Sequence, residues 1–205
     1  MAPDRRHGTN NSMNWGGISA ARPSGAKKMF PNLTVEKALA KQWQTIFKRC
    51  RVDADDPVAA WQEHIRKLQA HSAYLNQKQY TALKYSAPGT DVTLGLPKGH
   101  HWASAREMAK NGIEFTANLP TEETFTMADR TRADGIVTST KTLNYGGSLI
   151  EGIVVRFENG RVVESHASKG EDVLRKMIAT DEGSARLVEI ALVPHRCRIS
   201  KSGLM

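Results

Sequence analysis

Two adjacent carboxylates in a segment that favours extended backbone are the residues best suited to chemistry. Glu122 and Glu123 lie within residues 113–126, which are rich in threonine and phenylalanine. These residue types favour the pleated backbone of a β-strand, in which successive side chains point to opposite faces. The predicted faces are Thr121, Glu123 and Phe125 on one side and Glu122, Thr124 and Thr126 on the other. Only one of the two glutamates can therefore point inward.

A third carboxylate, Glu189, interrupts an otherwise apolar run over residues 187–193. An ionised carboxylate among apolar neighbours is costly unless it is paired, protonated or bound to a metal. Two interpretations stay open. In the first, which is the more frequent situation in proteins, Glu189 meets an arginine or a helix end, or lies on the wet face of a half-buried element. In the second, Glu189 is a metal ligand.

Histidines offer a further set of candidate ligands. His100 and His101 are adjacent in a predicted loop and could bind metal or substrate. Without a third ligand nearby, a solvated loop pair is the more frequent arrangement for such residues. His64 and His71 are seven residues apart on a predicted helix. We interpret both as residues of its polar face.

Two helices are predicted before these segments. Thr34 can cap a helix that runs to about Arg49, because threonine accepts a hydrogen bond from the first helical turn. Asp56 is the predicted cap of a second helix, with Pro57 at its first position, where proline is favoured. The connection between the helices is short, so we expect them to pack as an antiparallel pair.

The apolar pattern changes from a helical period to alternation at about Leu83, and we place a domain boundary at residues 86/87. The clearest hairpin signal is Asn159-Gly160, flanked by valine-containing segments over 153–157 and 161–165. Ser168 and Glu171 have the spacing of a capping box at the start of a helix. These elements predict an α+β fold: a helical amino-terminal portion followed by a mixed, largely antiparallel sheet with a packed helix.

Composition narrows the class of protein. The chain has 205 residues, 40% of them hydrophobic and 24% charged, as in ordinary globular proteins. No apolar stretch approaches the ~20 residues of a membrane span, so we expect a soluble protein with no membrane partner. Cys50 and Cys197 are far apart, which supports neither a disulfide framework nor a zinc knuckle and fits a reduced, cytoplasmic setting.

The net charge of +8 raises the question of a nucleic-acid partner. The basic residues are interleaved with acids, and we find neither an aromatic RNA-binding motif nor a helix-turn-helix signature. A basic nucleic-acid-binding protein is therefore the least favoured alternative, and no nucleic-acid partner is expected.

Several segments, taken together in this order and spacing, are specific, although each alone would be weak. They are Ala87-Pro88-Gly89-Thr90-Asp91 and its continuation to residue 97, residues 118–126, residues 149–152, and Asp181-Glu182-Gly183 leading to residues 189–193. From about Asn14 onward the chain resembles the aminopeptidase T (PepS/AmpS-like) family of dinuclear metallo-aminopeptidases.

This resemblance implies that Glu123 and Glu189 are carboxylate ligands of a centre with two divalent metal ions, which could be zinc, cobalt or manganese. Two such ions can together activate water and polarise a peptide carbonyl. The substrate would be a peptide. Glu123 is preferred over Glu122, which would face away or engage the peptide's free amino group. The resemblance identifies no ligand at His195, which we interpret as a loop histidine.

Family members are longer than this chain, and the resemblance implies that they continue beyond residues 200–203 into a segment that supplies histidine, tyrosine and a His-x-Asp pair to the metals. We therefore expect an internal portion of the enzyme, and a homo-oligomer. Residues 1–30 would be a poorly ordered basic leader and remnant of a missing domain, residues 31–86 a helical portion, and residues 87–205 a partial catalytic domain.

The predicted function is a metal-dependent aminopeptidase in a truncated form that is weakly active or inactive, since a metal held by two carboxylates is poorly defined. The alternative is a non-catalytic remnant that acts only in folding or dimerisation.

Overall fold

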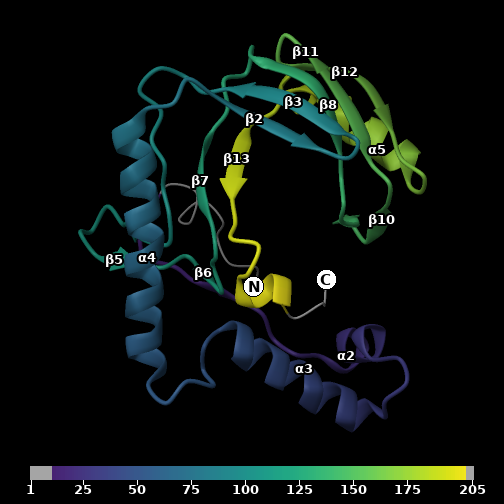
Figure 1. Cartoon of the computed structure of the whole chain (residues 1–205). Helices are drawn as coiled ribbons and strands as arrows, with labels where there is room; N and C mark the ends of the chain where they lie inside the picture. Colours follow the sequence, from purple (N-terminus) through teal and green to yellow (C-terminus); the bar gives the residue numbers. More distant parts are fainter. Residues whose placement is uncertain (1–10, 202–205) are drawn as a thin grey trace. The chain divides into compact units, whose positions relative to one another are not determined.

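The computed structural model of the chain describes residues 11–201 (Figure 1). The chain divides into two compact units, each assembled from separate segments. The first comprises Met1–Tyr74, Trp102–Phe125 and Ala191–Met205, and the second comprises Leu75–His101 and Thr126–Ile190. Helices dominate the first unit and an antiparallel sheet with one packed helix the second, so the predicted α+β class is confirmed.

The long helices begin where the sequence predicts. Helix α3 spans Val35–Arg49, and the Thr34 hydroxyl accepts a hydrogen bond from the Lys37 N–H at 3.4 Å. Helix α4 spans Pro57–Lys78, and Asp56 Oδ1 accepts from the Ala59 N–H at 2.9 Å. Both predicted caps are therefore confirmed, because each side chain satisfies a backbone donor that has no partner within its helix.

The predicted antiparallel packing of α3 on α4 is wrong. Helix α3 packs instead on α2, which spans Pro23–Met29. Their shared core consists of Ala26, Phe30 and Ala38. The core beneath α4 consists of Ile65, Leu68 and Ala105. Figure 1 shows α3 and α4 running in different directions. The prediction failed because α2, a seven-residue helix with no clear apolar period, packs on the start of the apolar face of α3 at Ala38 and Leu39, while Trp43 and Phe47 further along that face are exposed.

The predicted leader over residues 1–30 is described only in part, since residues 1–10 lie outside the described residues. The remainder holds α2 and strand β1 (Gly17–Ile18), which pairs in parallel with β6 (Asn118–Leu119). The Gly17 N–H donates to the Ala117 carbonyl at 2.7 Å. Because Ala26 and Phe30 are buried, residues 17–30 are part of the first unit's packed structure.

The second unit contains a five-stranded antiparallel sheet with the order β12-β11-β8-β3-β2. Its strands are β2 (Ala82–Ala87), β3 (Thr90–Gly95), β8 (Ala133–Thr138), β11 (Val154–Glu158) and β12 (Arg161–His166). Asn159 and Gly160 have φ of 49° and 78°, as a type I′ turn requires, so the predicted hairpin is confirmed. The boundary predicted at residues 86/87 falls inside the β2–β3 hairpin. The change of the apolar pattern from a helical period to alternation marks the passage from a helix to strands, not a boundary between domains.

Helix α5 (Glu171–Ile178) packs beside β9 (Leu143–Tyr145) and β10 (Ser148–Ile150), with Leu174 and Ile150 in their core. The predicted capping box is wrong. Glu171 Oε2 accepts from the Ala167 N–H at 3.2 Å, whereas the Ser168 N–H, which the box requires as its donor, bonds to the Glu151 carbonyl at 2.8 Å. The N-cap is Gly170, and the Ser168 hydroxyl donates to the Glu151 carbonyl at 3.0 Å. Ser168 therefore serves the neighbouring loop rather than the helix.

Short strands complete the structure. They are β4 (Glu107–Met108), β5 (Glu114–Phe115), β7 (Thr124–Met127) and β13 (Glu189–Leu192), with β4 paired to β5 and β7 to β13. A single-turn helix, α6, spans Arg198–Lys201. Among the helices of residues 11–201, none has both the length and the apolar character needed to cross a bilayer.

Candidate metal centre

The glutamate segment has the alternation that the sequence predicts. Strands β5, β6 and β7 lie within or beside residues 113–126, and the exposure of its side chains alternates. Buried side chains are Glu122, Thr124 and Thr126, whereas Thr121, Glu123 and Phe125 are partly exposed. The two predicted faces are therefore confirmed. Glu122, which is 5% exposed, is the glutamate that points into the interior.

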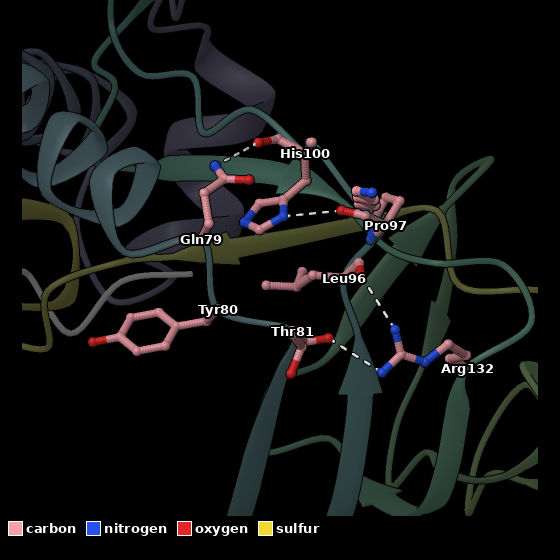
Figure 2. A pocket seen from close by; sticks show the side chains of 9 residues that line it. Gln79, Tyr80, Thr81, Leu96, Pro97, His100 and Arg132 are labelled. Atoms are coloured by element: carbon pink, nitrogen blue, oxygen red, sulfur yellow. Dashed lines mark hydrogen bonds between the residues drawn. The ribbon is translucent and has the colours of Figure 1, made fainter.

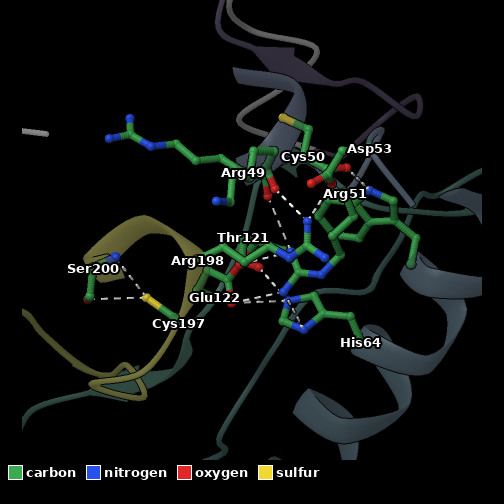
Figure 3. A network of polar contacts seen from close by, with 12 residues as sticks. Arg49, Cys50, Arg51, Asp53, His64, Thr121, Glu122, Cys197, Arg198 and Ser200 are labelled. Carbon is green, nitrogen blue, oxygen red and sulfur yellow. Dashed lines mark hydrogen bonds and ion pairs between the residues drawn. The ribbon is translucent and has the colours of Figure 1, made fainter. Parts of the chain in front are cut away.

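Arg51 neutralises the buried Glu122 carboxylate (Figure 3). Arg51 Nη1 lies 2.8 Å from Glu122 Oε1, and Nη2 donates a hydrogen bond to Oε2 at 3.1 Å. Arg51 is itself only 8% exposed and has a positive φ of 60° directly after the end of α3. A charge taken out of water needs such a partner, so both carboxylate oxygens of Glu122 are committed to this pair.

His64 joins the same network from α4. Its Nδ1 lies 3.0 Å from Arg51 Nη2 and its Nε2 lies 2.7 Å from the Thr121 carbonyl oxygen. A guanidinium can only donate, so Nδ1 must accept and Nε2 must carry the proton that bonds to Thr121. Burial lowers the pKa of His64 and favours this neutral form.

The interpretation of His64 as a polar-face residue is therefore wrong, while His71 is exposed as predicted. His64 follows Trp61 by one helical turn, and the two rings lie 5.5 Å apart, so His64 sits at the edge of the packed face of α4. The Trp61 indole N–H donates to the Cys50 carbonyl at 2.6 Å, and the Arg51 guanidinium lies 5.1 Å from the Trp61 ring. These contacts attach the glutamate segment to α4 and to the end of α3.

The two predicted metal ligands belong to different compact units, with Glu123 in the first and Glu189 in the second. Glu123 is partly exposed on the face opposite Glu122. Glu189 is exposed at the start of β13 and is followed by the buried Ile190, which matches the interpretation of a wet face on a half-buried strand. Their roles as ligands stay predictions.

The carboxylate oxygens of Glu123 and Glu189 are suited to part of a metal centre. Carboxylate oxygens suit hard and borderline divalent ions, whereas catalytic zinc sites use about three protein ligands. Within residues 11–201, no three histidine, cysteine, aspartate or glutamate side chains come together as a group that could hold an ion.

The remaining histidines have other surroundings. His100 is buried, and its Nδ1 donates to the Pro97 carbonyl at 3.0 Å. His101 is exposed, and its carbonyl accepts a hydrogen bond from the Thr126 hydroxyl at 2.8 Å. His195 is exposed in a turn after β13, as predicted. The two cysteines, Cys50 and Cys197, are buried and not joined by a disulfide.

A cavity of about 620 Å³ lies in the second unit, where the chain leaves α4 and enters β2 (Figure 2). Arg132 donates to the carbonyls of Leu96 and Thr81, both at 3.3 Å, and Gln79 donates to the His100 carbonyl at 3.1 Å. The lining residues are Gln79, Tyr80, Thr81, Leu96, Pro97, Lys98, Gly99, His100 and Arg132. Because this lining includes no carboxylate, the cavity is not the predicted metal centre.

Comparison with known families identifies the group to which the chain belongs. The family model described as thermophilic metalloprotease (M29) matches residues 1–205. The chain is a member of this M29 family. The resemblance to aminopeptidase T, predicted from the motifs, is thereby confirmed. Membership in a metalloprotease family implies the use of a divalent metal ion.

Individual M29 relatives agree with this assignment. Aminopeptidase AmpS of Bacillus subtilis is 44% identical over 201 residues, which are 98% of this chain and 49% of the relative. Aminopeptidase T of Thermus aquaticus is 47% identical over 192 residues, which are 94% of this chain and 47% of the relative. The solved structure of wild-type AmpT from Thermus thermophilus has a TM-score of 0.90 at 42% identity and matches 98% of this chain and 49% of its own. This M29 protein thus spans about half the length of the relatives it matches.

Proposed function

We propose that this M29 protein is the glutamate-bearing portion of a metal-dependent aminopeptidase that removes amino-terminal residues from peptides, with Glu123 and Glu189 as metal ligands. The names of its relatives support the reaction class. The observation that carries the choice of ligand is the alternation of Glu122 and Glu123. Glu122 is buried and paired with Arg51, so its neighbour is the glutamate on the other face.

The division of labour between the two glutamates follows from their surroundings. Divalent ions, when bound, supply Lewis acidity toward the peptide carbonyl and lower the pKa of water. Glu123 would contribute carboxylate oxygens to hold them, as Glu189 would from its own strand. Glu122 would serve as a positioning residue, because its ion pair with Arg51 holds the segment that carries Glu123 directly before β7. The alternative in which Glu122 binds the peptide's amino group is disfavoured, since both its oxygens already contact Arg51.

The proposal also covers the metal ions, the cellular setting and the assembly. We propose two ions per site, chosen from zinc, cobalt and manganese, and a cytoplasmic setting that suits two unpaired cysteines. We also propose a homo-oligomer. Met127 and Val188 are 64% and 60% exposed, and the Ala128 N–H donates to the Val188 carbonyl, so the two exposed apolar side chains lie on neighbouring segments. Exposed apolar surface of this kind is typical of protein–protein interaction sites, which supports the proposed assembly.

Activity of the 205-residue chain alone is proposed to be weak or absent, because two carboxylates define a metal position poorly. The competing proposal is a non-catalytic protein that acts in folding or dimerisation. The absence of a three-residue ligand group within residues 11–201 is the observation that favours it.

Hydrolysis of an aminoacyl p-nitroanilide by the purified chain, supplied in turn with zinc, cobalt and manganese, tests the proposal. The amino-acetylated form of the substrate serves as the blocked control, since an aminopeptidase requires the free amino group. The matched variants are Glu189→Ala and Glu182→Ala, the latter a 76% exposed glutamate of the same unit. Slow, metal-dependent hydrolysis that is lost only in Glu189→Ala supports the aminopeptidase. Metal binding and hydrolysis that are both absent favour the non-catalytic alternative.

A further inference from the structure

A second candidate site lies entirely within the first unit and is lined by residues outside the glutamate segment. A groove of about 420 Å³ is formed where α2, α3 and α6 meet. Its lining residues are Phe30, Lys41, Thr45, Lys48, Arg49, Arg198 and Lys201. Five of these seven side chains are cationic and none is acidic, so the lining is strongly positive.

One wall of the groove is a single face of α3. Lys41, Thr45 and Lys48 follow one another at spacings of four and three residues, which places them one above the other on the helix. The Lys41 ammonium lies 4.8 Å from the centre of the Phe30 ring, and Phe30 is only 9% exposed. Phe30 therefore gives this wall an apolar base, and the lysine ammoniums supply its charge.

The opposite wall is α6, which Arg198 fixes to the end of α3. Arg198 Nη1 donates to the Lys48 carbonyl at 2.7 Å and to Asp53 Oδ1 at 2.6 Å. Asp53 thus offsets the charge of Arg198. Lys201 lies three residues further along the same helix, on the same face.

The ordinary explanation for basic residues in this position is the helix dipole. Cations in the last turn of a helix are stabilised by its carbonyl end, which accounts for Lys48 and Arg49. It does not account for Lys41, which lies about two turns earlier, or for Lys201 on another helix. Within residues 11–201, the ammoniums of Lys41, Lys48 and Lys201 form no ion pair with a carboxylate. Three ammoniums that line one groove without a carboxylate partner among the described residues attract an anion.

We propose that this groove binds a compact anion of the polyphosphate class. Its volume is at the small end of the range for ligand sites, about 300–1,000 Å³. A polyphosphate concentrates several negative charges within a few ångströms, as the cluster of cations requires. An acidic peptide distributes its charges along a chain of about 3.3 Å per residue, and so matches the groove less well. The site is independent of the aminopeptidase activity proposed above.

Calorimetric titration of the chain with inorganic tripolyphosphate at low salt tests the proposal. We expect one ion per chain, with an affinity that falls as salt rises because the charges are solvent-accessible. The double variant Lys41→Gln/Lys48→Gln should bind at least about tenfold more weakly, since each ammonium contributes a charge-assisted contact. Lys201→Gln alone should weaken binding in the same direction and provides a second variant on a different helix.

The matched control is Arg66→Gln/Lys67→Gln, which removes the same charge from the exposed face of α4 in the same unit. Its affinity for tripolyphosphate should change less than about twofold. Equal losses of affinity for tripolyphosphate in both double variants would show general attraction of the anion to a basic chain and would contradict the proposed site. The absence of binding by the unaltered chain would also contradict it. A hexaglutamate peptide that binds more tightly than tripolyphosphate, and depends on Lys41 and Lys48, would overturn the assignment of ligand class.

Discussion

Arg51 Nη1 lies 2.8 Å from Glu122 Oε1, which brings a residue at the end of α3 against a carboxylate 71 positions later in the chain. This pair decides which of two adjacent glutamates is buried. Because the side chains of an extended segment alternate, fixing Glu122 inward also fixes Glu123 on the opposite face. The proposed ligand is thus oriented by a contact that it does not itself make.

Removing the arginine from this pair should destabilise the protein strongly. Arg51→Met leaves the Glu122 carboxylate buried without a partner, and we expect a loss of about 3–5 kcal/mol in the free energy of unfolding. Urea denaturation at pH 7 measures it. The control is Arg66→Met, whose pair with Glu63 is 70% and 47% exposed, so its loss should change the free energy of unfolding far less. Similar losses in the two variants would contradict the buried pair.

Neutral His64 should make stability depend on pH. Burial lowers the pKa of His64 in the folded protein from its ordinary 6.5, so the unfolded chain takes up this proton first as the pH falls. The stability contributed by the neutral ring is therefore complete above about pH 6.5 and declines as the pH falls toward the lower, folded-state pKa. Denaturation curves between pH 5 and pH 8 should show this loss.

The matching variants are His64→Gln, which removes the titrating group, and His71→Gln, which removes an exposed histidine from the same helix. His64→Gln should flatten the pH dependence of the free energy of unfolding, and His71→Gln should leave it unchanged. A curve for His64→Gln that falls as steeply as that of the unaltered chain would assign the dependence to other groups.

Features set by neighbouring residues can be predicted from the sequence. The Thr34 and Asp56 caps and the Asn159-Gly160 turn are each specified within a few residues, and all three are confirmed. Alternation along residues 121–126 is predictable for the same reason.

Features that depend on distant partners could not be predicted. Alternation does not say which face is buried, and here Arg51 decides it from the loop after α3. The sequence pattern places His64 on a polar face because its partners, Arg51 and Thr121, come from two other segments. Helix α2 lacks a clear apolar period, so the sequence does not reveal it as the partner of α3.

A side chain at Gly160 in the hairpin turn should destabilise the second unit. Gly160 has a φ of 78°, and a Cβ there would lie 2.1 Å from the Arg130 carbonyl oxygen. Gly99 in the same unit has a φ of 74°, and a Cβ at that position would meet nothing within 4 Å. Gly99→Ala should therefore cost only the free energy of placing a side chain on left-handed backbone, about 1–2 kcal/mol. Gly160→Ala should cost more than this control by about 1 kcal/mol or more, because the carbonyl must also move. Equal losses in thermal or urea denaturation would show that the turn relaxes freely.

Metal content after equilibrium dialysis against manganese or cobalt tests the ligand assignment most directly. Glu123→Gln and Glu189→Gln should each reduce the bound metal to near background, since each removes a proposed carboxylate ligand. Folded Glu122→Gln should retain it, because Glu122 faces Arg51 instead. Loss of metal in Glu122→Gln together with full retention in Glu123→Gln would contradict the assignment and make the buried glutamate the ligand.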